Sequence, residues 1–406
     1  MKTYSNILFL LAWFLLIGIF SISCEKEPKK GTPRIDYVRS TDPEKADSTF
    51  TSAFLGQLIA IVGENLGGAR QIFFNDQEAI LTPTYVTDRT ILVTVPSAAP
   101  LDITNKMTII FEDGYELIYD FPIEIPAPIL TSMKCEYVPD GGTAVLYGDY
   151  YFLPTTVTFP GDLEAEITAL FQDKIEVTVP AGTTSGRIKV ETLFGEAESE
   201  FLFRDNRNTI VNFDDLLHED WTAPVAYADS SPEIAPVSGN YAIIQSEAAA
   251  AWNWQNSLAI FAWGENLRGN VPLATGFVPN LDFRFEVNIT EEVPWYDIRM
   301  EIYFSPYGQG HGRDAVDPSF ARWKPWLDGP YSTDGWLTIS IPLSEFWFDR
   351  DDGTSATVGS QPLQSLDGLT NLNMMVFGPQ ESDASNTHPV QICVDNIRIV
   401  PHTVDE

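Results

Sequence analysis

Several residue types are scarce in this chain of 406 residues, and each scarcity excludes a class of protein. The sequence contains 3 cysteines and 4 histidines, without a CxxC motif or a Cys/His cluster, which excludes the usual structural zinc sites. It has 24 basic residues against 57 acidic ones, a formal net charge of −33. Such a chain does not attract nucleic acid or an anionic membrane surface by charge. An anionic glycan is also disfavoured, and a neutral polysaccharide fits best.

Motifs of the common enzyme classes are missing as well. The sequence lacks GxSxG, HExxH and GxGxxG, and also the Glu-x-Asp-x-x-Glu run of jelly-roll endoglucanases. Glycoside hydrolysis needs only two carboxylates, so an endo-acting glycanase stays a minor alternative. The sequence favours a binding protein that is not an enzyme. The hydrophobic fraction of 44% and the many aromatic residues argue against disorder.

The N-terminus has the pattern of an export signal. Lys2 precedes an apolar run from Ile7 to Phe20, which ends in Ser-Ile-Ser-Cys24. This run is shorter than the roughly 20 residues that span a membrane comfortably, so a membrane anchor is only the alternative. The last four residues resemble the lipobox of bacterial lipoproteins. That resemblance implies a signal peptide over residues 1–23, lipidation of Cys24 and a charged tether over residues 24–32.

Residues 33–204 hold an internal repeat. Gly63 aligns with Gly148, and Pro96 with Pro180, at nearly the same offset. Both copies contain an apolar run around the glycine and a Val-Thr-Val-Pro sequence, and both alternate apolar and polar residues in short stretches. This alternation is typical of β-sandwiches. The glycines are expected at strand ends that need a permissive backbone, and the prolines at the ends of edge strands.

The two copies resemble immunoglobulin-like IPT/TIG modules, which implies modules over residues 33–126 and 127–204. The motifs that carry the resemblance are Pro-x-Ile, Ile-x-Gly-x-x-Leu and Val-x-Val-Pro. Such modules usually serve as spacers or interaction domains. Neither copy contains a tryptophan or a histidine. Tyr147, Tyr150, Tyr151 and Phe152 could form a second sugar platform, but aromatic residues of a sandwich core are the favoured interpretation.

A third domain is predicted over residues 205–406. Leu281–Ile289 alternates apolar and polar residues, and Ile298–Phe304, Leu372–Phe377 and Ile392–Val400 are further strand-like runs. Long loops rich in glycine, proline and asparagine separate them. About ten such strands without helical periodicity predict a β-sandwich or jelly roll. Cys135 and Cys393 are expected to be buried free thiols rather than a disulfide.

Nine of the ten tryptophans lie in this third domain, between residues 221 and 347. Several lie in predicted loops beside amides, carboxylates or prolines, where they offer a flat apolar face with a polar rim. A pyranose ring presents one face of C–H groups and an edge of hydroxyls, so it matches this arrangement. The candidate ligand contacts are Trp252, Trp254, Trp295, Tyr296, Trp323 and Trp326. Polar candidates around them are Asn253, Gln255, Asn256, Asp297 and Arg299.

Each aromatic candidate has a plainer interpretation as a core residue. Trp252 and Trp254 are two apart, so in a strand they share one face and one role. Trp323 and Trp326 lie in a proline-rich loop that can pack on itself. For Trp336, which leads a strand, a core position is favoured.

The order of these parts resembles that of the surface glycan-binding proteins of Bacteroidota polysaccharide-utilisation loci. The resemblance is strongest at the lipobox and at the closing Val394-Asp-Asn-Ile-Arg-Ile. It implies binding of xyloglucan or another β-glucan, an outer-membrane lipid anchor facing the exterior, and two partners. These are a TonB-dependent transporter and its companion glycan-binding lipoprotein. Related jelly rolls also hold a structural Ca²⁺, for which Asp214 or Asp215 and Asp395 are the matching positions. The alternative is a surface adhesin or assembly protein that binds a protein partner through its Ig-like modules.

Overall fold

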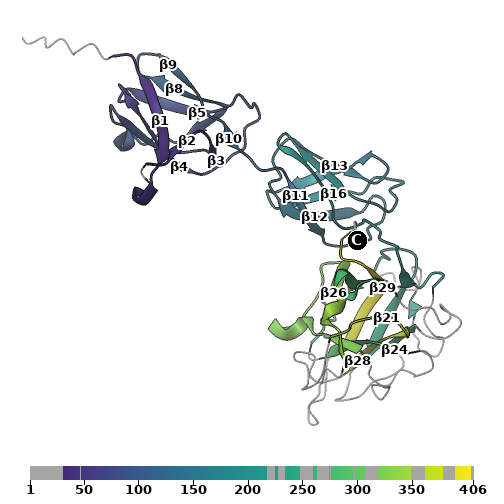
Figure 1. Ribbon diagram of the computed structural model, residues 1–406. Helices are drawn as coiled ribbons and strands as arrows, with labels where there is room; N and C mark the ends of the chain where they lie inside the picture. Colours follow the sequence, from purple (N-terminus) through teal and green to yellow (C-terminus); the bar gives the residue numbers. More distant parts are fainter. Residues whose placement is uncertain are drawn as a thin grey trace, which may run out of the picture. The chain divides into compact units, whose positions relative to one another are not determined.

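The computed structural model shows a chain built of β-strands (Figure 1). It describes residues 31–45, 47–216, 225–226, 234–246, 259–262, 274, 276–296, 298–306, 319–348, 362–377 and 389–403. The chain divides into two compact units, Met1–Ile125 and Pro126–Glu406. Helical elements in the described ranges are short 3-10 turns: η1 (Pro43–Lys45), η2 (Pro83–Tyr85), η4 (Val278–Asn280), η5 (Pro325–Asp328) and η6 (Leu343–Glu345). No helix in these ranges is long and apolar enough to span a bilayer.

The first unit is a β-sandwich. One sheet has the order β2-β1-β4-β7 and consists of β1 (Arg34–Ser40), β2 (Thr49–Phe50), β4 (Leu58–Glu64) and β7 (Thr90–Thr94). The other has the order β6-β5-β8-β9 and consists of β5 (Ala69–Phe74), β6 (Gln77–Ala79), β8 (Lys106–Phe111) and β9 (Glu116–Asp120). A short parallel pair joins β3 (Ala53–Phe54) to β10 (Ile123–Glu124). Alternate residues of both sheets, such as Ile61, Ile72 and Ile109, are fully buried between them.

The second unit begins with another sandwich, which we call module 2. One sheet has the order β11-β12-β16-β15 and consists of β11 (Ile129–Met133), β12 (Thr143–Asp149), β15 (Glu166–Leu170) and β16 (Lys174–Thr178). The other has the order β14-β13-β17-β18 and consists of β13 (Thr155–Phe159), β14 (Leu163–Glu164), β17 (Lys189–Thr192) and β18 (Gly195–Glu198). Tyr151 is a core residue of this module with 2% of its surface exposed, whereas Tyr147 is 37% exposed.

The repeated glycines mark a close approach of two strands. A Cβ on Gly63 would lie 2.0 Å from the carbonyl oxygen of Arg34, and one on Gly148 would lie 1.8 Å from that of Ile129. Neither glycine has a positive φ, so the requirement is space and not an unusual backbone conformation. The expectation for the prolines holds only in part. Pro96 follows the edge strand β7, but Pro180 follows β16, which lies inside its sheet between β12 and β15.

The C-terminal domain follows module 2 in the same unit and also consists of two sheets (Figure 1). The larger has the order β20-β21-β29-β23-β26, with β19 paired to β29. Its strands are β19 (Thr209–Val211), β20 (Val225–Ala226), β21 (Tyr241–Ser246), β23 (Leu281–Asn288), β26 (Leu337–Pro342) and β29 (Val390–Pro401). The smaller has the order β22-β28-β24-β25-β27 and consists of β22 (Ala259–Ala262), β24 (Arg299–Pro306), β25 (Ser319–Trp323), β27 (Trp347–Phe348) and β28 (Leu369–Phe377).

The predicted all-β fold is confirmed. The expected strands at Leu281–Ile289, Ile298–Phe304, Leu372–Phe377 and Ile392–Val400 correspond to β23, β24, β28 and β29, and the strand expected after Trp336 corresponds to β26. Their inward side chains form one core that includes Phe283, Phe285, Phe304 and Phe346. Cys135 and Cys393 are buried free thiols, as expected. Burial raises the pKa of the Cys393 thiol to about 12, so the thiol stays protonated and unreactive at neutral pH.

Module 2 covers the edge of the larger C-terminal sheet. Strand β26 is the last strand of that sheet, and an edge strand leaves backbone groups unpaired. The amide of Thr338 donates to the carbonyl oxygen of Lys134 at 3.0 Å. The amide of Glu136 donates in turn to the hydroxyl of Thr338 at 2.7 Å. The segment after β11 therefore adds backbone partners to β26 and joins the two domains.

A buried ionic network lies beside this contact. Arg398 of β29 contacts Glu286 of β23 at 2.7 and 3.0 Å, and Glu136 of module 2 at 2.6 Å. Arg284 contacts the other oxygen of Glu136 at 2.8 Å and the carboxylate of Asp282 at 2.8 Å. Arg398 and Glu286 are 0% exposed, and Glu136 is 6% exposed. Two arginines and three carboxylates thus pair across the domain junction, with Glu136 as the contribution of module 2.

The positive charge of Arg398 is stabilised by its carboxylate partners. Burial opposes the positive charge of Arg398, but Glu286 and Glu136 outweigh it and raise the pKa of its guanidinium well above the ordinary value. The ring of Tyr137 lies under the same guanidinium, 5.1 Å from ring centre to carbon. Removing one member of such a network leaves an uncompensated buried charge, which is far more costly than losing a surface ion pair.

We predict that Arg398→Met lowers the free energy of unfolding of the 126–406 unit by about 3–5 kcal/mol, because Glu286 and Glu136 lose their shared counter-charge. Urea unfolding of the full chain measures this change. Arg70→Met is the matched control, since Arg70 pairs with Glu112 at the surface of the first unit and its loss costs at most about 1 kcal/mol. Equal effects of the two substitutions would contradict the role assigned to the network.

Candidate functional site

The smaller sheet of the C-terminal domain has two faces of different character. Met300 and Ile302 of β24 point into the core, so Arg299 and Glu301 lie on the opposite face. On the neighbouring strand β28 the same alternation puts Asn371 and Asn373 on that opposite face. The outward face of a sandwich sheet usually meets water. Here the four polar residues are only 3%, 1%, 1% and 0% exposed, in the order Arg299, Glu301, Asn371 and Asn373.

This polar face has hydrogen-bonding groups of both kinds. Arg299 donates from Nε to a carboxylate oxygen of Glu301 at 3.1 Å. Neither the amide oxygen nor the amide nitrogen of Asn373 has a hydrogen-bond partner within the described part of the chain. An unsatisfied buried amide costs about 1–3 kcal/mol, and such groups in native proteins usually have a reason. Asn373 is therefore a buried polar group whose partner does not lie among the described residues.

An aromatic cluster forms part of the core of this domain. The indole of Trp295 packs edge-on against Trp323, with 5.0 Å between ring centres, and Trp323 packs in the same way against Tyr331 and Phe285. The backbones of Trp295 and Tyr331 exchange two hydrogen bonds of 2.8 Å. This bridge fixes the loop after β23 against the loop before β26.

The structure corrects the prediction for Trp295. Its side chain is 3% exposed and belongs to the domain core, so its indole offers no open face to a ligand. Trp323 is only partly buried, but three aromatic rings surround it and the same core holds it. The backbone bridge turns Trp295 inward and the next residue, Tyr296, outward. Among the predicted aromatic contacts whose side chains the structure describes, Tyr296 is the exposed one, at 41%.

The remaining predicted contacts lie outside the described residues. Trp252, Trp254, Asn253, Gln255, Asn256 and Asp297 fall in undescribed ranges. The backbone of Trp326 lies in η5, but its side chain is outside the description. The predicted lipidation site Cys24, the signal peptide 1–23 and most of the tether 24–32 are outside it too.

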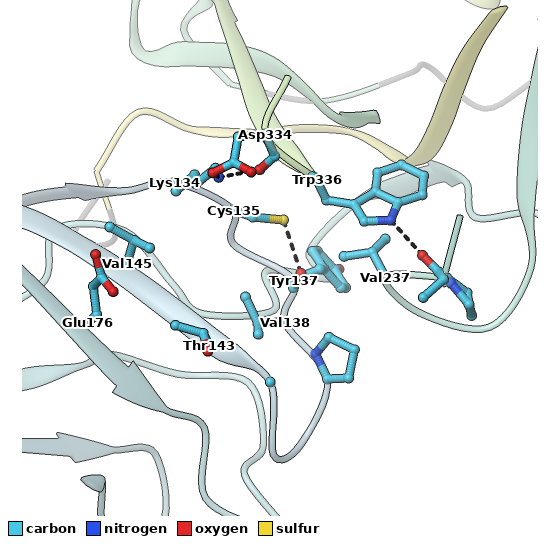
Figure 2. A pocket seen from close by; sticks show the side chains of 15 residues that line it. Lys134, Cys135, Tyr137, Val138, Thr143, Val145, Glu176, Val237, Asp334 and Trp336 are labelled. Atoms are coloured by element: carbon cyan, nitrogen blue, oxygen red, sulfur yellow. Dashed lines mark hydrogen bonds and ion pairs between the residues drawn. The ribbon is translucent and has the colours of Figure 1, made fainter. Parts of the chain in front are cut away.

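Trp336 lies at the junction with module 2 and not in the domain core. Its Nε1 donates to the carbonyl oxygen of Ala235 at 2.8 Å, and its ring packs edge-on against Tyr241 at 5.4 Å. The side chain is half-buried and lines a crevice of about 440 Å³ (Figure 2). Thr143 and Glu176 of module 2 line the other side. The expectation of a core position is thus only half correct, because Trp336 is partly buried and packs at the junction. No pattern near Trp336 in the sequence indicates module 2 as its neighbour.

The proposed calcium ligands lie on either side of one loop. Asp214 accepts the amide of Asn240 at 2.8 Å, and Asp395 accepts the hydroxyl of Ser238 at 3.1 Å. Burial, with a smaller contribution from the charges of Glu286 and Asp214, raises the pKa of the Asp395 carboxyl to about 9. Ca²⁺ takes six to eight oxygen ligands. Two carboxylates supply part of such a set, and no cluster of three His, Cys, Asp or Glu suited to a metal occurs among the described residues. Calcium binding therefore stays a prediction.

The C-terminal domain is similar to a known family of glycan-binding modules. Residues 203–401 match the family model described as the surface glycan-binding protein B xyloglucan binding domain. The C-terminal domain belongs to this family, whose members are non-catalytic glycan-binding proteins. That agrees with the prediction that the chain is not an enzyme.

Relatives extend the similarity to the rest of the chain. The surface glycan-binding protein PbSGBP-B from Prevotella bryantii is 28% identical and aligns over 92% of this chain and 99% of its own, with a TM-score of 0.66. A surface glycan-binding protein B from a complex xyloglucan utilization locus in Bacteroides uniformis shares the fold, with 16% identity, 91% and 100% coverage and a TM-score of 0.51. An IPT/TIG domain-containing protein of Bacteroides ovatus is 32% identical over 215 residues, which is 48% of this chain. The match spans 44% of that relative's length.

We predict that Ca²⁺ raises the melting temperature of the full chain relative to a chelator, and that Asp395→Asn removes this rise.

In chelator, the raised pKa of the Asp395 carboxyl makes the stability of the chain depend on pH. The folded chain holds a proton that the unfolded chain releases above about pH 4, so stability falls as pH rises from about 4 towards 9. Asp395→Asn should abolish that fall. Calorimetric scans at pH 5 and pH 8 measure both effects, and an unchanged melting temperature with and without Ca²⁺ would refute calcium binding.

Proposed function

We propose that the C-terminal domain binds an extracellular neutral polysaccharide of the β-glucan class, with xyloglucan favoured, and does not cleave it. The observation that carries this proposal is the match of residues 203–401 to a xyloglucan-binding family. The charge of the chain supports it, because a net charge of −33 disfavours an anionic ligand.

The described residues suggest how the domain holds a sugar chain. Tyr296 offers an exposed ring on which a pyranose can stack, next to the rigid cluster of Trp295 and Trp323. A ring that covers one face of an aromatic side chain buries about 75–125 Å², which contributes roughly 2 kcal/mol. Arg299, Glu301 and Asn373 are as buried as Trp295, so they back the sheet and do not face a ligand directly. Trp252 and Trp254 stay proposed contacts.

A few such contacts give weak binding. Two or three stacked rings, less the cost of ordering the glycan, correspond to roughly micromolar to millimolar dissociation constants. Weak binding suits capture at a cell surface, where many copies hold one polymer and each copy must release it. We propose that lipid at Cys24 anchors the chain to the outer membrane, facing the exterior. There it works with a TonB-dependent transporter and a companion glycan-binding lipoprotein.

We predict that xyloglucan in a native gel retards the full chain and that Tyr296→Ala weakens this retardation about tenfold, because one stacking face is lost. Mixed-linkage β-glucan, laminarin, mannan and xylan serve as the comparison polymers. Trp295→Ala is the structural control. It leaves a large cavity in the core and should lower stability by about 3–5 kcal/mol. No retardation by any neutral polymer would overturn the proposal, and release of reducing ends would identify a glycanase instead.

A protein-binding role is the second candidate, and two observations favour it. Trp295 and Trp323 pack inside the domain, as tryptophans of an adhesin without a glycan platform would. Module 2 also exposes Leu153 and Phe171, at 63% and 51%. The gel assay separates the two roles, because an adhesin of this kind would not be retarded by any soluble glycan.

A further inference from the structure

The junction between module 2 and the C-terminal domain contains a crevice that the proposed binding face does not include. Its volume is about 440 Å³, which falls in the range of roughly 300–1,000 Å³ typical of small-molecule sites. Thr143 of β12 and Glu176 of β16 form one wall, and Asp334 and Trp336 of the C-terminal domain form the other (Figure 2). Pockets at domain interfaces are frequent ligand sites.

The indole of Trp336 is held in a fixed position at this crevice. Its hydrogen bond to Ala235 and its edge-on contact with Tyr241 fix the ring from the side of the C-terminal domain. The half-buried ring lines the crevice together with Val145 and Val237. A flat, immobile apolar surface of this kind is suited to the C–H face of a pyranose.

The polar groups of the crevice suit a ligand without charge. Lys134 Nζ contacts a carboxylate oxygen of Asp334 at 3.0 Å, and Lys174 Nζ contacts Glu176 at 2.8 Å. Each carboxylate is thus neutralised by a lysine but keeps oxygens that can accept hydrogen bonds. The hydroxyl of Thr143, an exposed residue, can donate and accept. Hydroxyl groups of a neutral sugar match this set better than a phosphate or an ammonium group does.

The two walls keep their spacing because the junction is locked. The network of Glu136, Arg284, Glu286 and Arg398 and the hydrogen bonds of Thr338 tie the domains together next to the crevice. A site whose walls are already in place costs less to occupy than one that must assemble on binding.

A second hollow shares part of its lining, including Trp336, with the crevice. It measures about 410 Å³ and is lined by Asn288, Thr290, Glu291 and Glu292 as well as by Asp334 and Trp336. This segment leads along the chain to the exposed Tyr296. Trp336 therefore lines both the junction crevice and a hollow whose lining segment precedes Tyr296 in the chain.

We infer that the junction crevice is a second carbohydrate subsite, in which Trp336 takes the face of a neutral pyranose and Thr143 and Glu176 bind its hydroxyls. The inference rests on the proposed function, because the sugar belongs to the same polysaccharide that the C-terminal domain binds. A polymer engages both places at once, and the linked contact raises its affinity.

Blocking the crevice from the side of module 2 tests the inference without disturbing Trp336. Thr143→Trp adds a bulky side chain at an exposed position of the wall, and Thr156→Trp adds the same side chain at an exposed position of β13 outside the crevice. We expect Thr143→Trp to weaken binding of xyloglucan polymer by the full chain about fivefold in isothermal titration calorimetry. Thr156→Trp should bind as the wild type does, and melting temperatures should show that both variants are folded.

Glu176→Trp provides a second block from the neighbouring strand, since Glu176 lies opposite Val145 in the β12–β16 pair. If wild type binds xyloglucan and both folded crevice variants bind it equally well, the second subsite is refuted while the proposed function stands. If wild type binds no neutral polysaccharide, the proposed function fails and the subsite fails with it. Weakening by both crevice variants, and not by Thr156→Trp, supports the subsite.

Discussion

The contact between Arg398 and two glutamates from different domains is the constraint on which the second unit depends. Glu286 belongs to the same sheet as Arg398, whereas Glu136 comes from module 2, 262 positions away in sequence. Burial of three charged groups is unfavourable unless each finds its partners, so the pairing strongly prefers one arrangement of the domains. Thr338 reinforces this arrangement by pairing the edge strand β26 with the segment after β11. One face of the larger C-terminal sheet thus packs on the domain core, and charged residues of the other face pair with module 2.

The fold was largely predictable from the sequence because its signals are local. Alternation identified β23, β24, β28 and β29, and the aligned glycines identified the repeat that ends with module 2. The same alternation was incomplete as a guide to burial. In β23 the polar residues Asp282, Arg284 and Glu286 alternate with Phe283 and Phe285, a pattern that usually means one face in water, yet all are buried. The partner that covers the polar face is module 2, and nothing near β23 in the sequence indicates it.

The binding residues were harder to predict than the fold for a related reason. Trp295 and Tyr296 are adjacent, so in an extended segment one ring points inward and the other outward. The sequence does not specify which, because the choice depends on the backbone bridge to Tyr331, some 36 positions later. Asn373 shows the same limit. Its strand was predicted, but the lack of partners for its buried amide becomes visible only when its neighbours on the sheet are known.

Abundant tryptophan in a loop-rich domain therefore has two roles that sequence patterns do not separate. Trp295 and Trp323 form an internal aromatic cluster that stiffens the loops, and a stiff support is what an exposed ring such as Tyr296 needs in order to hold a sugar. Trp336 combines both roles. Its indole is held by a hydrogen bond to Ala235, and it also lines an open crevice. A rigid junction that itself presents an aromatic surface links the mechanical task of module 2 to the proposed binding task of the C-terminal domain. In this view module 2 is part of the proposed binding site, because it supplies one wall of that crevice as well as the counter-charge that holds the two walls in place.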